Sequence, residues 1–259
     1  MRLSLIASAL LALLVLPLLS AGAAHAAVAK KQVHAPTPAK MILVRATKEA
    51  LDLPISNRLQ ALESQGEQGY GNLVSIMFDE KMPMESRWRA VTAAGRIGQA
   101  QAKPEIVRAL GRSEWFMRNA GLVAMAGIDQ AEAVAWARKL VSDKALVVRT
   151  AAVETLAELK DRASASLLWQ KLYAKENFRR GQSLFVRRHI VETLAVLEPT
   201  GSEGKFVEVL SDKDASLHPF AILALEHMTN VRFNEAAPLP LQREHWQSWW
   251  KEKSRSAKL

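Results

Sequence analysis

SDKALVVRTAAVETLAEL (residues 142–159) and SLFVRRHIVETLAVL (residues 183–197) carry the pattern on which the fold prediction depends. Both contain VR followed by VETLA, with a basic residue at the same place, and three further segments align on such a residue. The five aligned residues, which we name the anchors, are Arg87, Arg118, Arg149, Arg187 and His218. Successive anchors are 31, 31, 38 and 31 residues apart. A nearly fixed interval of this size indicates an array of repeated structural units.

Each anchor is followed by a stripe of small or apolar residues. Positions three, four, seven and eight after the anchor are small or apolar in all five segments, except for Glu226. This spacing places the stripe on one face of an α-helix. A second amphipathic segment lies between successive anchors, and helix-start residues open these segments at Pro104, Asp129, Asp161 and Ser202. The sequence therefore predicts an all-α fold of repeated helix pairs.

The turn between the two helices of a unit carries a further signal in two units. Asp143 stands six residues before Arg149, and Asp212 stands six residues before His218. With the period, these features resemble HEAT repeats over about residues 54–230. The resemblance implies a right-handed α-α superhelix (solenoid) of about five to six helix pairs, with the anchored helices lining a concave face. The anchors and the two aspartates are interpreted as structural, because such an aspartate can cap a helix while the arginine ties adjacent units.

The first 26 residues have the three parts of a secretory signal peptide. Arg2 precedes an apolar run from Leu3 to Leu19, and a small-x-small triplet ends at Ala26. We expect export to a bacterial periplasm with cleavage after Ala26; the alternative is an uncleaved N-terminal anchor. The chain has no cysteine, so it is not expected to be a lipoprotein or to contain disulfides. Residues 27–53 are predicted to be a flexible leader followed by the start of a helix.

Composition and motifs argue against an enzyme. The sequence contains no HExxH, GxSxG or GxxxxGK motif. Only His189 and Glu192 could share a helix face as metal ligands, which is too few for a metal site. We therefore expect no catalytic residue, no metal and no cofactor. The net charge of +9 favours an acidic protein or an anionic envelope component as partner, and no nucleic acid is expected outside the cytoplasm.

The interval between Arg149 and Arg187 is seven residues longer than the period, and insertions in repeat arrays usually become loops on one face. This insertion mixes basic and aromatic residues, so it is predicted to be an anion-recognition loop; the alternative is a solvated turn with locally packed Phe residues. Residues just after an anchor would face the concave groove. The candidate partner-binding residues are Trp88, Arg89, Phe178, Arg179, Arg180, Arg188, His189 and Glu192.

The C-terminal region, residues 231–259, is predicted to form a Trp-rich capping helix with a basic tail. Trp246, Trp249 and Trp250 have helical spacing and would cover the apolar end of the array. The alternative is an interfacial helix that contacts a membrane through the same tryptophans. The sequence thus predicts a scaffold or adaptor that binds an acidic protein segment or another anionic ligand. A peripheral protein of a membrane or anionic polymer is the alternative, and nucleic-acid binding is a weaker one.

Overall fold

The computed structural model describes residues 38–198 and 200–256, so the predicted signal peptide lies outside the described residues. The described part is mainly helical, which confirms the all-α class. The α-helices are α1 Pro38–Asp52, α2 Ile55–Glu63, α3 Gly66–Phe78, α4 Met84–Gly98, α5 Lys103–Leu110, α6 Trp115–Ile128, α7 Gln130–Leu140, α8 Leu146–Glu158, α9 Ala165–Leu172, α10 Val186–Leu197, α11 Glu203–Val209, α12 His218–Thr229 and α13 Leu239–Ser256. Short 3-10 turns are η1 Gln99–Ala102, η2 Arg162–Ser164, η3 Lys175–Asn177 and η4 Ala215–Leu217.

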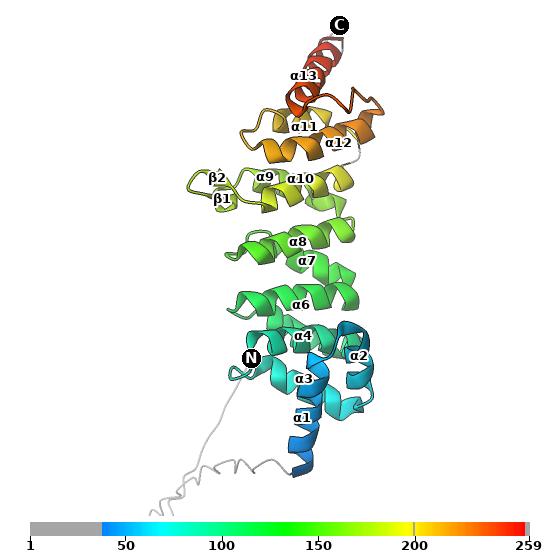
Figure 1. Cartoon of the computed structure of the whole chain (residues 1–259), viewed down its shortest axis with the longest axis vertical. Helices are drawn as coiled ribbons and strands as arrows, with labels where there is room; N and C mark the ends of the chain where they lie inside the picture. Colours follow the sequence, from blue (N-terminus) through cyan, green and yellow to red (C-terminus); the bar gives the residue numbers. More distant parts are fainter. Residues whose placement is uncertain (1–37, 199, 257–259) are drawn as a thin grey trace, which may run out of the picture. The chain divides into compact units, whose positions relative to one another are not determined.

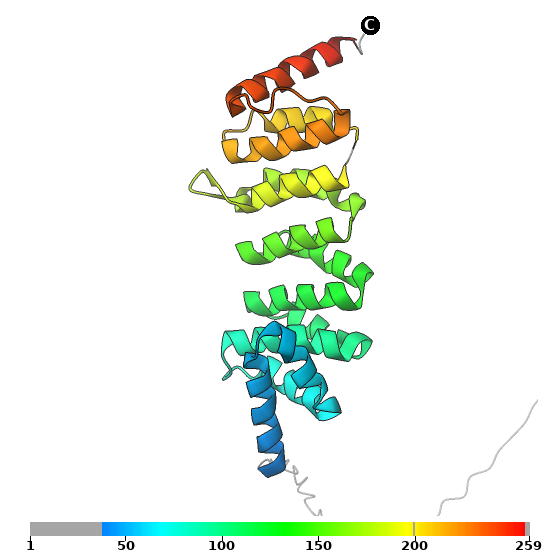
Figure 2. The same cartoon turned by 45° about the vertical axis from the view of Figure 1, so that its right-hand side comes forward.

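The helices from α3 to α12 form two layers. The anchored segments are α4, α6, α8, α10 and α12, which lie side by side in one row (Figures 1 and 2). Each of them packs against the helix that precedes it, so α3, α5, α7, α9 and α11 form the second layer. The predicted repetition of helix pairs is therefore seen directly in the packing.

Small residues in the apolar stripes allow neighbouring helices to approach closely. A Cβ atom added to Gly95 on α4 would stand 2.8 Å from the Cβ of Ala124 on α6. One added to Gly121 on α6 would stand 2.8 Å from the Cγ of Leu110 on α5. Both distances are shorter than carbon atoms tolerate, so larger side chains here would separate the helices.

Two buried anchors join successive helix pairs. Arg118 donates from Nε and Nη2 to the two carboxylate oxygens of Asp143, at 2.6 and 2.7 Å, and Arg187 pairs with Asp212 at 2.5 Å. Each aspartate lies in the turn of the following pair. The last anchor, His218, has its Nε2 3.0 Å from the carbonyl oxygen of Asp212. Arg118 and Arg187 therefore connect successive helix pairs, whereas His218 bonds within the turn of its own pair.

Arg87 uses a different partner because Arg112 occupies the position of the turn aspartate. Its Nη2 donates to Glu114 at 2.9 Å, and its Nε donates to the carbonyl of Met77 at 3.1 Å. Arg112 contacts the same carboxylate, with its Nε 3.3 Å from Oε2. Glu114 therefore balances two arginines at this junction.

We expect protonation of Glu114 to destabilise the fold in acid. Burial raises the pKa of its carboxyl, but hydrogen bonds from Arg87, its own backbone N–H and Arg112 outweigh burial and lower the pKa from 4.5 to about 2. The ionised form thus stabilises the fold above pH 4.5, by about 2 kcal/mol, and this contribution is lost as the pH falls toward 2. Urea unfolding should show Glu114→Gln less stable than the natural protein at neutral pH. The difference should shrink toward pH 2; a pH-independent difference would contradict the assignment.

The helix α13 packs against α11 and α12 at the end of the row (Figure 2). Trp246 is fully buried, and its ring lies edge-on to Phe233 with the centroids 5.0 Å apart. A Cβ added to Gly204 on α11 would stand 2.7 Å from the Trp250 ring. Trp246 is thus inaccessible in this arrangement, and a membrane contact would have to use Trp249 and Trp250. These contacts place α13 against the last helix pair of the row.

Candidate functional site

The insertion before Arg187, which was predicted to be a loop, contains a short β-hairpin. Strands β1 (Phe178–Arg179) and β2 (Gln182–Ser183) are antiparallel, with Phe178 opposite Ser183. Arg180 and Gly181 form the two-residue turn with φ of 52° and 78°. Positive φ at both positions is the geometry of tight hairpins, and glycine adopts it without strain. The hairpin therefore has a defined shape set by its own turn.

Buried polar contacts fix the base of the hairpin. The Asn177 side chain is 1% exposed and donates to the carbonyl of Lys171 at 2.8 Å. Its Oδ1 accepts from Nε of the anchor Arg149 at 2.9 Å. The guanidinium of Arg187 lies 4.4 Å from the centre of the Phe178 ring. Asn177 thus takes the place that an aspartate holds in the neighbouring unit. The insertion therefore still accepts a hydrogen bond from the anchor of the preceding helix pair.

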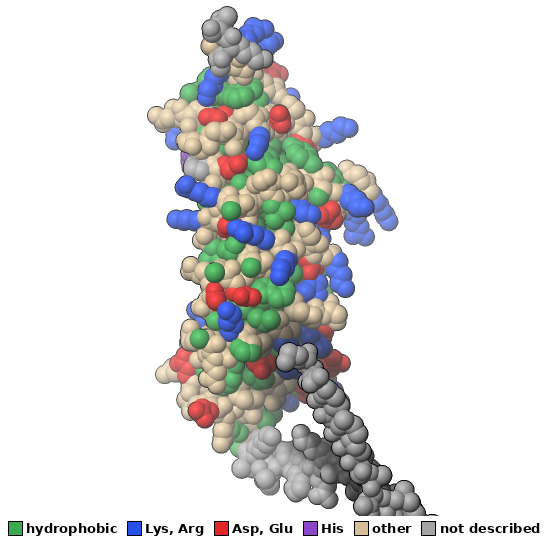
Figure 3. Space-filling view, turned by 180° about the vertical axis from the view of Figure 1, so that it is seen from behind, with side chains coloured by type: hydrophobic (Ala, Val, Ile, Leu, Met, Phe, Trp, Pro, Cys, Tyr) green, Lys and Arg blue, Asp and Glu red, His purple; other side chains and the backbone are tan. Residues whose placement is uncertain are grey.

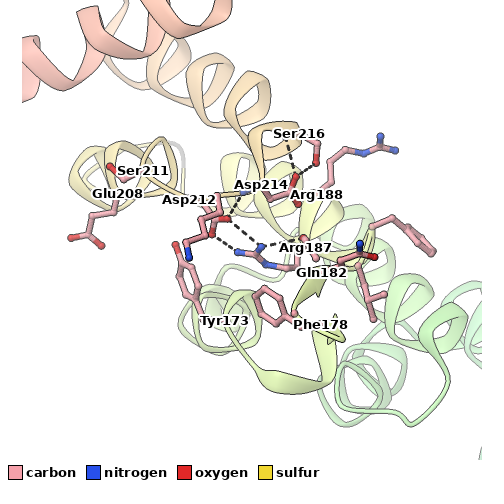
Figure 4. A pocket seen from close by; sticks show the side chains of 15 residues that line it. Tyr173, Phe178, Gln182, Arg187, Arg188, Glu208, Ser211, Asp212, Asp214 and Ser216 are labelled. Carbon is pink, nitrogen blue, oxygen red and sulfur yellow. Dashed lines mark hydrogen bonds and ion pairs between the residues drawn. The ribbon is translucent and has the colours of Figure 1, made fainter.

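A pocket of about 870 Å³ lies between this hairpin and the turn that follows α11 (Figure 4). We name it the hairpin pocket. Tyr173, Phe178 and Phe185 supply aromatic wall, and Tyr173 and Phe185 are each about half exposed. The Arg187–Asp212 pair also lines the pocket. Its volume is in the range of sites that hold a few side chains of a ligand.

The acidic groups of this turn are mostly satisfied internally. Asp212 is ion-paired with Arg187. The Asp214 carboxylate accepts from the backbone N–H and the hydroxyl of Ser216, at 3.0 and 2.6 Å. Burial raises the pKa of Asp214, but its hydrogen bonds outweigh burial and lower it. Both aspartates are thus held ionised by the protein itself, and Glu208 is the remaining carboxylate in the lining.

The basic groups around the pocket are available to a ligand. Arg188 and Lys213 line it and are exposed, and Arg179 and Arg180 are exposed on the hairpin. Within residues 38–198 and 200–256, none of these four cations has a carboxylate within ion-pair distance. Lys and Arg side chains gather where the hairpin projects (Figure 3). These four cations form what we name the basic rim of the hairpin pocket. The site therefore combines exposed aromatic side chains with positive charge that has no paired carboxylate among the described residues.

The structure brings together only part of the predicted partner-binding set. Phe178 and Arg188 line the hairpin pocket, whereas Arg179 and Arg180 lie on the hairpin and do not line the pocket. His189 and Glu192 lie in a separate cavity of about 220 Å³ between α8 and α10, beside Glu154 and Glu158. The His189 Nδ1 is 3.4 Å from Glu154 and 3.6 Å from Glu192. Three carboxylates make this part of the anchored row acidic, so an acidic ligand is favoured at the hairpin instead.

The predicted residues on α4 are occupied by internal contacts. Trp88 is half-buried and its Nε1 donates to Asn119 at 3.1 Å. Arg89 donates to the carbonyl of Leu51 at 3.1 Å and to Asp52 at 3.0 Å, and it pairs with Glu85. Arg89 thus ties α4 to the end of α1. Trp88 lines a second cleft, which is separate from the hairpin pocket.

An exposed apolar row escaped the sequence analysis. Met84, Trp115, Val147 and Phe185 lie at the starts of α4, α6, α8 and α10 and are 51, 42, 42 and 52% exposed. We name them the edge row. Met84 and Trp115 line one cavity of about 550 Å³, and Phe185 lines the hairpin pocket. The edge row could have been found in the sequence, because each of its apolar residues stands two or three positions before an anchor.

Comparison with known families adds no assignment: no family model matches the chain, and no curated protein is similar to it in sequence. In the described part of the chain, no three His, Asp or Glu side chains are grouped so that they could hold a metal ion. None of the described helices is both long and apolar enough to cross a membrane.

Proposed function

We propose that the stacked helix pairs form a HEAT-like α-solenoid, and that the protein is a non-enzymatic adaptor of the bacterial cell envelope. It binds an extended acidic segment of a partner protein at the hairpin pocket. The observation that carries this proposal is the combination of aromatic walls with four cations that are unpaired among the described residues. Aromatic residues and arginine dominate the energetics of protein interfaces, and unpaired charge selects the sign of the ligand.

The edge row supports an extended ligand. Adjacent packed helices lie roughly 8–10 Å apart, so the edge row offers apolar contacts at about this interval. A polyproline II segment advances about 9.3 Å in three residues and returns its side chain to the same side. A segment with an apolar residue at every third position and acidic residues between them would match both the edge row and the basic rim.

The test uses a fluorescent 15-residue peptide of Glu-Glu-Leu repeats and fluorescence anisotropy. We expect Arg179→Glu/Arg180→Glu/Arg188→Glu to weaken binding by about tenfold or more, because three attractions become repulsions. Binding by the natural protein should weaken with salt, as contacts with exposed charges do. The matched control reverses three exposed cations elsewhere, Lys48, Lys139 and Arg162.

An equal loss in the control variant would show only a dependence on net charge and would count against the hairpin pocket. A Lys-Lys-Leu peptide of the same length must bind weakly. Flotation of the natural protein with anionic vesicles addresses the membrane alternative. Flotation that survives the hairpin reversals but needs residues 239–259 would favour that alternative.

A further inference from the structure

A second cleft lies at the other end of the anchored row. The helix α2 packs against α4 (Figures 1 and 2). Residues of α2, α4 and α6 line a cleft of about 640 Å³. We name this space the α2 cleft. Its apolar and small lining residues are Ile55, Leu59, Trp88, Ala93, Gly95, Val123, Ala124, Ala126 and Gly127. None of these residues lines the hairpin pocket, so the two sites are independent.

The floor of the α2 cleft is open because its residues are small. A Cβ atom added to Gly127 would meet nothing within 4 Å. Around this floor, Ile55 is 76% exposed and Val123 is 50% exposed. Apolar surface of this extent in a concave site is typical of ligand pockets, since a bound chain would remove it from water.

Two arginines bring positive charge to the lining of the α2 cleft. Both Arg58 and Arg96 line it, and Arg96 is exposed. Neither has a carboxylate within ion-pair distance among the described residues. The carbonyl of Leu53 accepts from Nε and Nη2 of Arg58, at 3.2 and 2.9 Å, which fixes this guanidinium and leaves its Nη1 for a ligand.

The charges near Arg58 favour an added anion. Burial lowers the pKa of Arg58, and the positive charge of Arg89 lowers it further, although Asp52 and Glu85 act in the opposite direction. Arg89 itself is satisfied by those two carboxylates. One carboxylate, Glu158 of α8, lines the cleft. An anion beside Arg58 and Arg96 would therefore gain two charge-assisted contacts.

We propose that the α2 cleft binds a linear amphiphile with one apolar chain and an anionic head group. The head lies at Arg58 and Arg96, and the chain lies over Gly95, Ala124 and Gly127. The volume fits a single small ligand, whereas a docked protein helix would need an interface of roughly 800 Å² on each partner. This site is separate from the proposed peptide site and does not depend on it.

The binding test uses 11-(dansylamino)undecanoate, whose fluorescence rises in an apolar site, with dodecanoate as competitor. Dodecanoate should displace the probe at least tenfold better than dodecyltrimethylammonium or dodecanol, which have the same chain without the anion. Shortening the competitor from twelve to ten carbons should weaken it by about fourfold for each CH₂ removed. A cationic amphiphile that competes equally well, or a probe that does not bind, would overturn the proposal.

Substitutions locate the site. Gly127→Phe should fill the floor and weaken probe binding by about tenfold or more, and Arg58→Gln/Arg96→Gln should do the same by removing both cations. The matched controls are Gly71→Phe, an exposed helical glycine whose added Cβ also meets nothing within 4 Å, and Arg162→Gln. Circular dichroism checks that each variant folds. Equal loss in Gly71→Phe, or no loss in Gly127→Phe, contradicts this location.

Peptide binding separates the two proposals. Gly127→Phe should bind the Glu-Glu-Leu peptide as the natural protein does, and the hairpin reversal variant should bind the dansyl probe normally. Loss of both ligands in either variant would contradict two independent sites. Failure of the peptide assay alone leaves the probe measurements as the test of the α2 cleft.

Discussion

Asp143→Ala is expected to lower the free energy of unfolding by about 3–5 kcal/mol, because it leaves a buried arginine without its counter-charge. Arg118 and Asp143 have side chains only 9 and 7% exposed and make two parallel hydrogen bonds. The same carboxylate accepts from the backbone N–H of Ala145 at 2.8 Å, so the turn before α8 loses a partner as well. Urea unfolding followed by circular dichroism at 222 nm measures the effect.

Two comparisons make this prediction specific. Glu49→Ala breaks the exposed Arg45–Glu49 pair, whose side chains are 82 and 64% exposed, and should cost no more than about 0.5 kcal/mol. Arg118→Met/Asp143→Leu removes both buried charges and should recover much of the loss, because no charge is left unpaired. If the double variant is as unstable as Asp143→Ala, the loss comes from packing or from the turn, and the ion pair is not its cause.

The helix pairs could be predicted from the sequence because their signals are local and repeated. A stripe at positions three, four, seven and eight needs only helical geometry to become a buried face, and Asp129 caps α7 as its place before the segment suggests. The ties between units were partly predictable. Asp143 and Asp212 have the expected spacing, whereas Glu114 and Asn177 replace them where an arginine or an insertion changes the turn.

The candidate sites were less predictable, because they depend on contacts between distant segments. The basic residues of the insertion were recognised, but the sequence does not show that Arg187 is buried against Phe178 while Arg188 is exposed. The hairpin pocket also needs the turn after α11, about thirty residues away, which no local pattern connects to it. The α2 cleft depends on how α2 meets α4 and α6, and the segment before Arg87 has no clear period.

Arginine therefore has two roles in this protein, and burial separates them. Arg87, Arg118, Arg149 and Arg187 are buried and bonded to neighbouring units, so their substitution acts on stability. The exposed arginines of the hairpin have no such bonds among the described residues, so their substitution should change binding while the fold persists. An experiment on function must use the second set.

Trp246→Ala should also cost about 3–5 kcal/mol, because it empties a large buried volume beneath the last helix. Trp246 is fully buried, and its ring is edge-on to both Phe233 and Trp249, with centroids 5.0 and 5.3 Å away. Such aromatic pairs add about 0.5–1.5 kcal/mol each beyond the burial of apolar area. Without this residue, α13 should detach from α11 and α12 before the rest of the row unfolds.

Limited trypsin digestion measures that detachment, since α13 carries Lys251, Lys253 and Arg255. Cleavage there should be faster in Trp246→Ala, and urea unfolding should show a lower midpoint. Trp115→Ala is the matched control, because Trp115 is 42% exposed and its loss should cost about 1 kcal/mol and leave α13 protected. Equal stability and equal digestion of Trp246→Ala and the natural protein would show that α13 does not cap the row, and would favour the alternative in which the tryptophans of this helix contact a membrane.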